Sequence, residues 1–195
     1  MKVSASYKHA AAVNNVWKWY RDSESALLDS RQKIKEKVRS GKALPIEFMF
    51  KSPKEIADQF SNGMKELKYA TMLSLISAIE AAFRIDHQIR LTGKKSDGIS
   101  RKLYQLSPNK KKGEWSRFGD DILKTWKNIT DSRELEKSIK NLMDLLPLRD
   151  WLAHGRCWEK RFTQNYDPET IYSIAIRLMR NLPHDNFFGR KYLSP

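Results

Sequence analysis

The sequence predicts an all-α protein, a bundle of four to five main helices with an additional N-terminal helix and a basic loop. Apolar residues recur at the spacing of a helix face in several segments, whereas the alternation typical of strands is nowhere sustained. The 195 residues, 40% of them hydrophobic, suit one domain with its own core. We therefore expect a single domain over 1–195, with its core at 54–182 and a helical extension at 1–52.

Two long helical segments are expected first. Residues 11–40 contain no proline or glycine, which predicts one long helix or two shorter ones. Residues 41–53 hold two prolines and predict a loop. Ser52 and Pro53 suit a helix cap and its first position, so a helix should follow over 54–91, with a break near Gly63 and an end at Gly93.

A basic tract and a short helix are expected next. The tract 94–113 has seven lysines and arginines against the single Asp97, and its composition is that of a linker. Residues 114–128 predict a helix whose apolar face comprises Trp115, Phe118, Ile122, Leu123 and Trp126.

The remaining helices are marked by caps and stop signals. Asp131 or Ser132 can cap a helix that Pro147 should kink or restart. Gly155 should stop the stretch that follows. Asp167 caps a last helix, with Pro168 at its first position.

The charge indicates a polyanionic partner. Lys and Arg number 37 against 23 Asp and Glu, which gives a net charge of +14 and a pI near 9.8. Nucleic acid is the simplest such partner. The single Cys157 excludes an intramolecular disulfide framework and a zinc–cysteine module. Neither a signal peptide nor a membrane span is evident, so we expect a cytoplasmic protein with no membrane contact.

Several kinds of active site are excluded because their motifs are missing. The chain has no phosphate-binding glycine loop, no nucleophile elbow and no HExxH motif. Its four histidines are scattered, so neither a metal nor a cofactor is expected. Cys157 has no obvious base nearby and is interpreted as an ordinary half-buried thiol.

The segment 149–156, with the sequence RDWLAHGR, concentrates groups that can handle a phosphate. Arg149 is a permanent cation whose planar fork suits phosphate oxygens. His154 belongs to the residue type that titrates near neutrality and moves protons. Asp150 lies four residues before His154 and could orient its ring. The alternative is a helix end with surface arginines and a histidine facing the dipole.

This segment resembles the RxxxxH signature of the HEPN superfamily, through Arg149, the polar Asp150 and the ending Ala153-His154-Gly155. That family comprises small all-helical domains, many of them metal-independent ribonucleases. The resemblance implies an endoribonuclease with a toxin or phage-defence role, RNA as substrate, and an antitoxin or other regulatory protein as partner. Arg156 stands where toxins of the best-known two-component systems carry tyrosine, which argues against that subgroup.

RNA cleavage without a metal needs a base for the 2′-hydroxyl, an acid for the leaving oxygen, and cations for the phosphorane. One Arg149 and one His154 cannot fill every role, so the resemblance implies a homodimer with two copies at its axis. On an ideal helix these two residues lie about 140° apart, so a distortion near Pro147 or Gly155 is needed for them to share a face.

Four residues are candidates for supporting roles. Asp150 would orient His154, and Arg156 would hold a neighbouring phosphate. Glu80 and Arg84 are i,i+4 partners on an earlier helix and could support the site, or could simply form a solvated ion pair.

The basic tract is a candidate contact for the RNA backbone, because clustered lysines release counterions from phosphates. Tyr104 and Trp115 could stack on bases. The alternative is a solvated loop. The basic residues concerned are Lys94, Lys95, Arg101, Lys102, Lys110, Lys111 and Lys112.

Two other functions stay open. One is a non-catalytic HEPN-like module that binds RNA or a protein partner. The other is a helical DNA-binding protein, although no helix-turn-helix pattern is evident. The aromatic cluster from Trp17 to Tyr20 is expected to pack into the core or a dimer interface.

Overall fold

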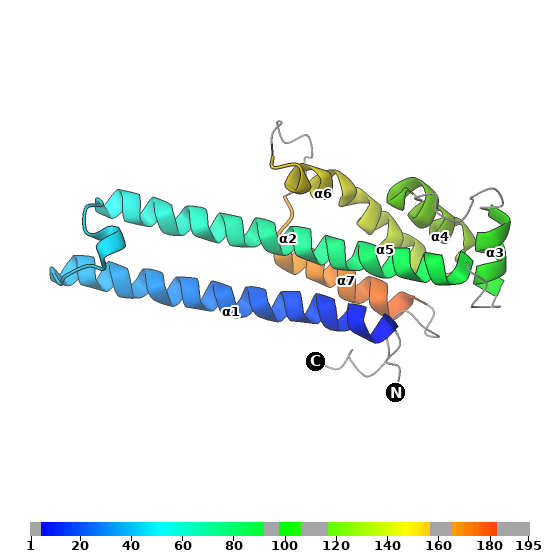
Figure 1. The fold of residues 1–195 in the computed structure, drawn as a ribbon, viewed down its shortest axis with the longest axis horizontal. Helices are drawn as coiled ribbons and strands as arrows, with labels where there is room; N and C mark the ends of the chain where they lie inside the picture. Colours follow the sequence, from blue (N-terminus) through cyan, green and yellow to red (C-terminus); the bar gives the residue numbers. More distant parts are fainter. Residues whose placement is uncertain (1–4, 92–97, 107–116, 157–164, 183–195) are drawn as a thin grey trace.

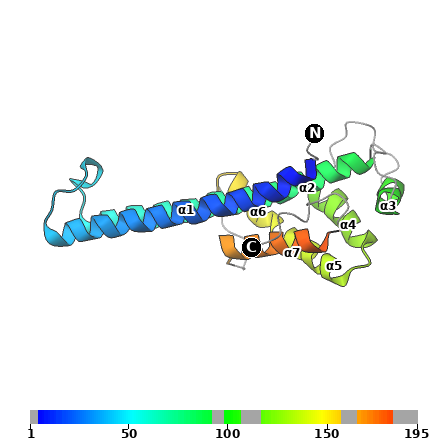
Figure 2. The same ribbon diagram turned by 90° about the horizontal axis from the view of Figure 1, so that it is seen from below.

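The computed structural model describes residues 5–91, 98–106, 117–156 and 165–182, and it confirms the all-α class because these ranges contain no strand. Two long antiparallel helices, α1 (Ala5–Ser40) and α2 (Pro53–Leu91), form a hairpin along the molecule (Figure 1). The shorter helical elements lie along one half of it, and the end with the turn projects beyond them (Figure 2). These elements are α3 (Gly98–Leu106), η2 (Phe118–Leu123), α4 (Lys124–Ile129), α5 (Arg133–Asp144), α6 (Leu146–Ala153) and α7 (Pro168–Asn181).

Helix α2 begins as predicted but has no break. The Ser52 hydroxyl accepts from the Glu55 backbone N–H, and the Glu55 carboxylate accepts from the Ser52 backbone N–H at 2.7 Å, which completes a capping box. The predicted break near Gly63 is wrong. Glycine costs a helix interior roughly 1 kcal/mol, but α2 continues through Gly63 beside Leu27 of α1, where an added Cβ would make an ordinary contact at 3.8 Å. The predicted end at Gly93 lies outside the described residues.

The projecting end of the hairpin has a small core of its own. Gly41 turns the chain with φ 65°, and a short 3₁₀ helix, η1 (Ile46–Phe48), forms inside the predicted loop. Buried side chains from both long helices and from η1 pack together there, namely Ile34, Phe48, Ile56 and Phe60.

Part of the basic tract is helical, which corrects the prediction of a linker. Helix α3 forms because its inner face packs on the bundle, where Leu103 is fully buried. The Arg90 side chain at the end of α2 donates to the hydroxyl of Ser100 at 3.1 Å. The same arginine forms a buried ion pair with Asp86 at 2.6 Å.

The apolar face predicted for 114–128 is confirmed where the structure describes it. Phe118, Ile122, Leu123 and Trp126 are all buried, whereas Trp115 lies outside the described residues. The helix begins with a turn of π-helix, η2, before α4 continues in regular α geometry. The predicted aromatic packing near the N-terminus is found in part. Tyr20 is fully buried and Trp17 stacks on Tyr172 with ring centroids 4.5 Å apart, whereas Trp19 is 49% exposed.

The predicted caps and stops of the later helices are confirmed. The Ser132 hydroxyl accepts from the Leu135 backbone N–H, and the Asp167 carboxylate accepts from the Thr170 backbone N–H at 2.7 Å. Pro147 lies in the first turn of α6, so the chain restarts a helix there after Leu145.

Candidate functional site

Helix α6 is tied to α2 by two arginine–glutamate pairs, one at each end of the segment 149–156. Near its start, Arg149 donates to the carboxylate of Glu80. At the other end of the segment, just beyond helix α6, Arg156 donates to the carboxylate of Glu66 at 2.6 Å. Because Glu66 precedes Glu80 on α2, the segment runs antiparallel to α2, with His154 between the two ties.

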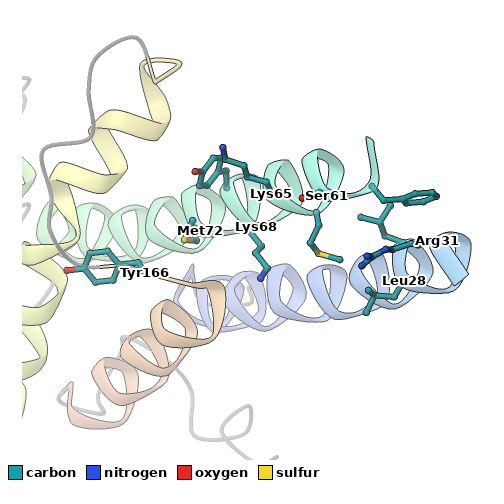
Figure 3. A pocket seen from close by; sticks show the side chains of 11 residues that line it. Leu28, Arg31, Ser61, Lys65, Lys68, Met72 and Tyr166 are labelled. Carbon is teal, nitrogen blue, oxygen red and sulfur yellow. The ribbon is translucent and has the colours of Figure 1, made fainter. Parts of the chain in front are cut away.

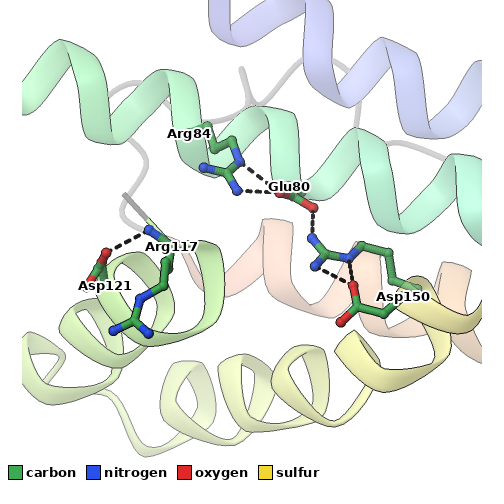
Figure 4. Close-up of polar contacts among 6 residues, drawn as sticks. Glu80, Arg84, Arg117, Asp121 and Asp150 are labelled. Atoms are coloured by element: carbon green, nitrogen blue, oxygen red, sulfur yellow. Dashed lines mark hydrogen bonds and ion pairs between the residues drawn. The ribbon is translucent and has the colours of Figure 1, made fainter. Parts of the chain in front are cut away.

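Glu80 is the centre of a charged network in the middle of α2 (Figure 4). One of its carboxylate oxygens accepts from Arg84 at 2.8 Å, and the other accepts from Arg149. The side chain of Glu80 is only 16% exposed. The structure therefore brings together both supporting residues predicted on the earlier helix and the predicted catalytic arginine.

Arg149 is bound by two carboxylates, which use only some of its hydrogen-bond donors. Its Nε and Nη2 donate to Asp150 at 2.9 and 2.6 Å, while Nη1 donates to Glu80. A guanidinium has five N–H groups, so two make no hydrogen bond to the described residues. Burial alone would lower the pKa of Arg149, but the hydrogen bonds to Glu80 and Asp150 outweigh it and raise the pKa above its ordinary value. The group stays a positioned cation.

His154 caps the C-terminus of α6 and is exposed. The helix ends here in a Schellman motif, because the Arg156 backbone N–H donates to the Trp151 carbonyl at 3.0 Å. Gly155 has φ 71° and supplies the left-handed turn, as the predicted stop requires. The Asp150 carbonyl accepts from the His154 backbone N–H, and its carboxylate accepts from Arg149.

Arg156 follows with an unusual backbone and a well-bound side chain. Its φ of 59° is uncommon for a residue with a Cβ and carries strain. The guanidinium lies over the ring of Tyr69, 5.1 Å from its centroid, and pairs with Glu66. The rings of Tyr69 and Trp151 are in turn nearly perpendicular, with their centroids 5.5 Å apart. The sequence reasoning anticipated Arg156 and missed its partners on α2.

One signal could have found these partners. Glu66, Tyr69, Glu80 and Arg84 follow the three- and four-residue spacing of one helical stripe, since fourteen residues are close to four turns. Glu66 and Glu80 therefore lie on one face of the helix. Two acids on one helix face indicate that the segment packed against that face supplies two cations.

The predicted RNA contacts in the basic tract fall in two groups. Arg101 and Lys102 are exposed on α3, which both views place at the end of the bundle away from α6 (Figures 1 and 2). The structure therefore does not bring them to Arg149. Tyr104 on the same helix is 64% exposed. The other predicted contacts, Lys94, Lys95, Lys110, Lys111 and Lys112, lie outside the described residues.

In the part of the chain that the structure describes, no three His, Cys, Asp or Glu side chains gather so that they could hold a metal ion. None of the described helices combines the length and the apolar character needed to cross a bilayer. Comparison with known proteins gives no family assignment, because no family model, no curated protein and no solved structure matches the chain.

Proposed function

We propose that this chain is a HEPN-like, metal-independent endoribonuclease whose site combines Arg149 and His154 from two copies of the chain. The observation that carries the proposal is Arg149 anchored on Glu80, five residues before an exposed histidine, with two N–H groups that make no hydrogen bond to the described residues. The setting that the sequence resemblance suggests is a toxin or phage-defence role in the cytoplasm, with an antitoxin or other regulatory protein as partner.

Arg149 would bind and polarise the scissile phosphate. Its remaining N–H groups suit a non-bridging oxygen, and the negative charge that develops on the phosphorane favours a fixed cation beside it. The Asp150 side chain is 50% exposed, so its carboxylate can turn to solvent when a phosphate enters. Glu80 is far less exposed and would keep the guanidinium in place.

His154 would transfer protons. An imidazole in reach of the 2′-hydroxyl can remove its proton, and a protonated imidazole can give one to the leaving 5′-oxygen. One histidine cannot be base and acid in the same step, which is why the proposal requires a dimer with two His154 residues at its axis. Arg156 would contact a neighbouring phosphate.

A second candidate function is supported by the same network. Two carboxylates offset the charge of Arg149, which is also what a purely structural tie between α2 and α6 requires. The alternative is thus a non-catalytic HEPN-like module that binds RNA or a protein partner.

Cleavage of a labelled tRNA or other structured RNA in EDTA separates the two candidates. The wild-type protein should cleave, while His154→Ala and Arg149→Ala should lose cleavage by about 100-fold or more. Arg133→Ala, an exposed arginine on α5, serves as the matched control and should cleave normally. Intact RNA with the wild type, or equal cleavage by all three variants, would leave the enzyme proposal without support.

A further inference from the structure

A groove lies between α1 and α2 where the hairpin projects beyond the bundle (Figure 3). Its volume is about 390 Å³, at the lower end of the range found for ligand sites. Apolar side chains from both helices form its lining, among them Leu28 and Met64, and Tyr166 closes the end nearest α7. Along α2 it extends from Phe60 to Met72, roughly 18 Å at the rise of an α-helix.

The charged residues in this lining are all basic. Arg31 comes from α1, and Lys65 and Lys68 come from α2, with no Asp or Glu among the lining residues. Lys68 and Arg31 extend toward the space between the two helices (Figure 3). A concave surface that combines cations with apolar walls suits a ligand that has both phosphates and flat rings.

The groove adjoins the candidate site through Tyr69. This tyrosine lines the groove, and the guanidinium of Arg156 lies over its ring. Arg156 is two residues beyond His154, so the end of α6 meets the groove at this point. An arginine plane supported by a tyrosine is a surface on which an unpaired base can stack.

We propose that this groove binds a short single-stranded segment of RNA next to the bond cleaved at His154. The inference rests on the proposed function for its position in the reaction, and it adds the strand state and the path of the substrate. Lys65 and Lys68 contact phosphates at the rim, and bases enter between the apolar walls. A duplex is excluded because its bases are stacked inside and cannot reach the lining of the groove.

The lining argues against the same face of a second copy as occupant. Arg31, Lys65 and Lys68 of one copy would then face the same cations of the other. RNA removes that repulsion and releases counterions as it binds. The dimer of the proposed function places a different surface, the one around Arg149 and His154, at its axis.

The test measures binding of a fluorescent single-stranded oligoribonucleotide to the full chain carrying His154→Ala, so that the probe is not cleaved. The groove variant adds Lys65→Glu and Lys68→Glu. The matched control adds Lys137→Glu and Lys140→Glu, two exposed lysines with the same spacing on α5, beside a hollow that also contains acids. Circular dichroism and gel filtration confirm that each variant keeps its fold and its oligomeric state.

We expect the groove variant to bind about tenfold more weakly, with the slope of log K against log salt reduced by about 1.4, while the control changes little. Unlabelled single-stranded RNA should compete with the probe far better than duplex RNA of the same sequence. Equal losses in both variants, unchanged binding in the groove variant, or equal competition by duplex would overturn the inference. So would a groove variant that loses only its oligomeric state.

Cleavage by the wild type is scored separately, which distinguishes the two failures. If the groove variant loses binding and the wild type does not cleave, RNA binding in the groove is supported and ribonuclease activity is contradicted. If the wild type cleaves and the groove variant binds fully, ribonuclease activity is supported and RNA binding in the groove is contradicted.

Discussion

Arg149 of α6 donates a hydrogen bond to the carboxylate of Glu80 on α2, 69 residues earlier in the chain. The same carboxylate accepts from Arg84, so one acid holds two arginines that come from different helices. A side chain fixed in this way loses little further freedom when a ligand binds, which is what a preorganised phosphate site requires. The relationship links the stability of the α2–α6 contact to the position of the candidate catalytic cation.

Glu80→Gln should affect both stability and catalysis. The substitution keeps the size of the side chain and removes the charge between two arginines, at a cost of about 1–3 kcal/mol in the free energy of unfolding. If Glu80 positions Arg149, the Glu80→Gln substitution should lower kcat by about tenfold or more while KM stays near its original value. Chemical denaturation and steady-state cleavage check the two effects. Unchanged kcat together with reduced stability would assign Glu80 a structural role only.

His154→Ala should separate function from stability. The side chain is exposed at the end of α6, so the free energy of unfolding should stay within about 0.5 kcal/mol of the wild type. Under the proposed function, cleavage should nevertheless be lost. Thermal unfolding and the RNA assay on one preparation provide the measurement. A variant that unfolds easily would show that His154 has a packing role, and a stable variant that still cleaves would exclude it from the chemistry.

The helices could be predicted largely from local signals. Capping residues act within one turn, which is why Ser52, Ser132 and Asp167 marked helix starts correctly. The errors came from tertiary packing. The break predicted at Gly63 follows from the low helix propensity of glycine, which is visible in the sequence, whereas the packing of α1 against α2 is not. Burial of Leu103 turned part of a charged tract into a helix in the same way.

The candidate site was predictable only in part. The spacing of Arg149 and His154 and the pair Glu80 and Arg84 are sequence features, and the structure joins the first arginine to this pair. The contact between Arg149 and Glu80 depends on how α6 packs against α2, and no local sequence pattern predicts that packing. Arg156 shows the same limit, since its contacts with Glu66 and Tyr69 depend on two positive φ angles in succession after His154.

The buried pair of Asp86 and Arg90 should be the costliest ion pair to break among those described here. Both side chains are at most 5% exposed, and removing Asp86 takes a carboxylate away from a cation that stays buried in the core. Asp86→Ala should therefore destabilise the protein by about 3–5 kcal/mol. Asp120→Ala is the matched control, because Asp120 makes an i,i+4 pair with Lys124 on the surface and should cost at most about 1 kcal/mol. Similar losses in both variants would contradict this difference.

The cap of α7 should make stability depend on pH in the acid range. Backbone and side-chain hydrogen bonds from Thr170 lower the pKa of Asp167 below its ordinary value of 3.8. The contribution is therefore complete above pH 3.8 and is lost as the pH falls through the lowered pKa. Asp167→Ala should cost about 1 kcal/mol at neutral pH and less in acid. Asp131→Ala, which removes an exposed aspartate outside the cap, should show no such trend in the same denaturation series.

A composite site predicts how activity changes when active and inactive chains are mixed. If both chains of a dimer must supply His154, only dimers of two wild-type chains cleave RNA. Co-expression of wild type with an equal amount of His154→Ala should then leave about one quarter of the activity, because random pairing makes that fraction of intact dimers. Independent sites would leave about one half. Mixing with Arg133→Ala, which keeps its histidine, should leave activity unchanged. A linear decline with the share of His154→Ala would show that each chain works alone.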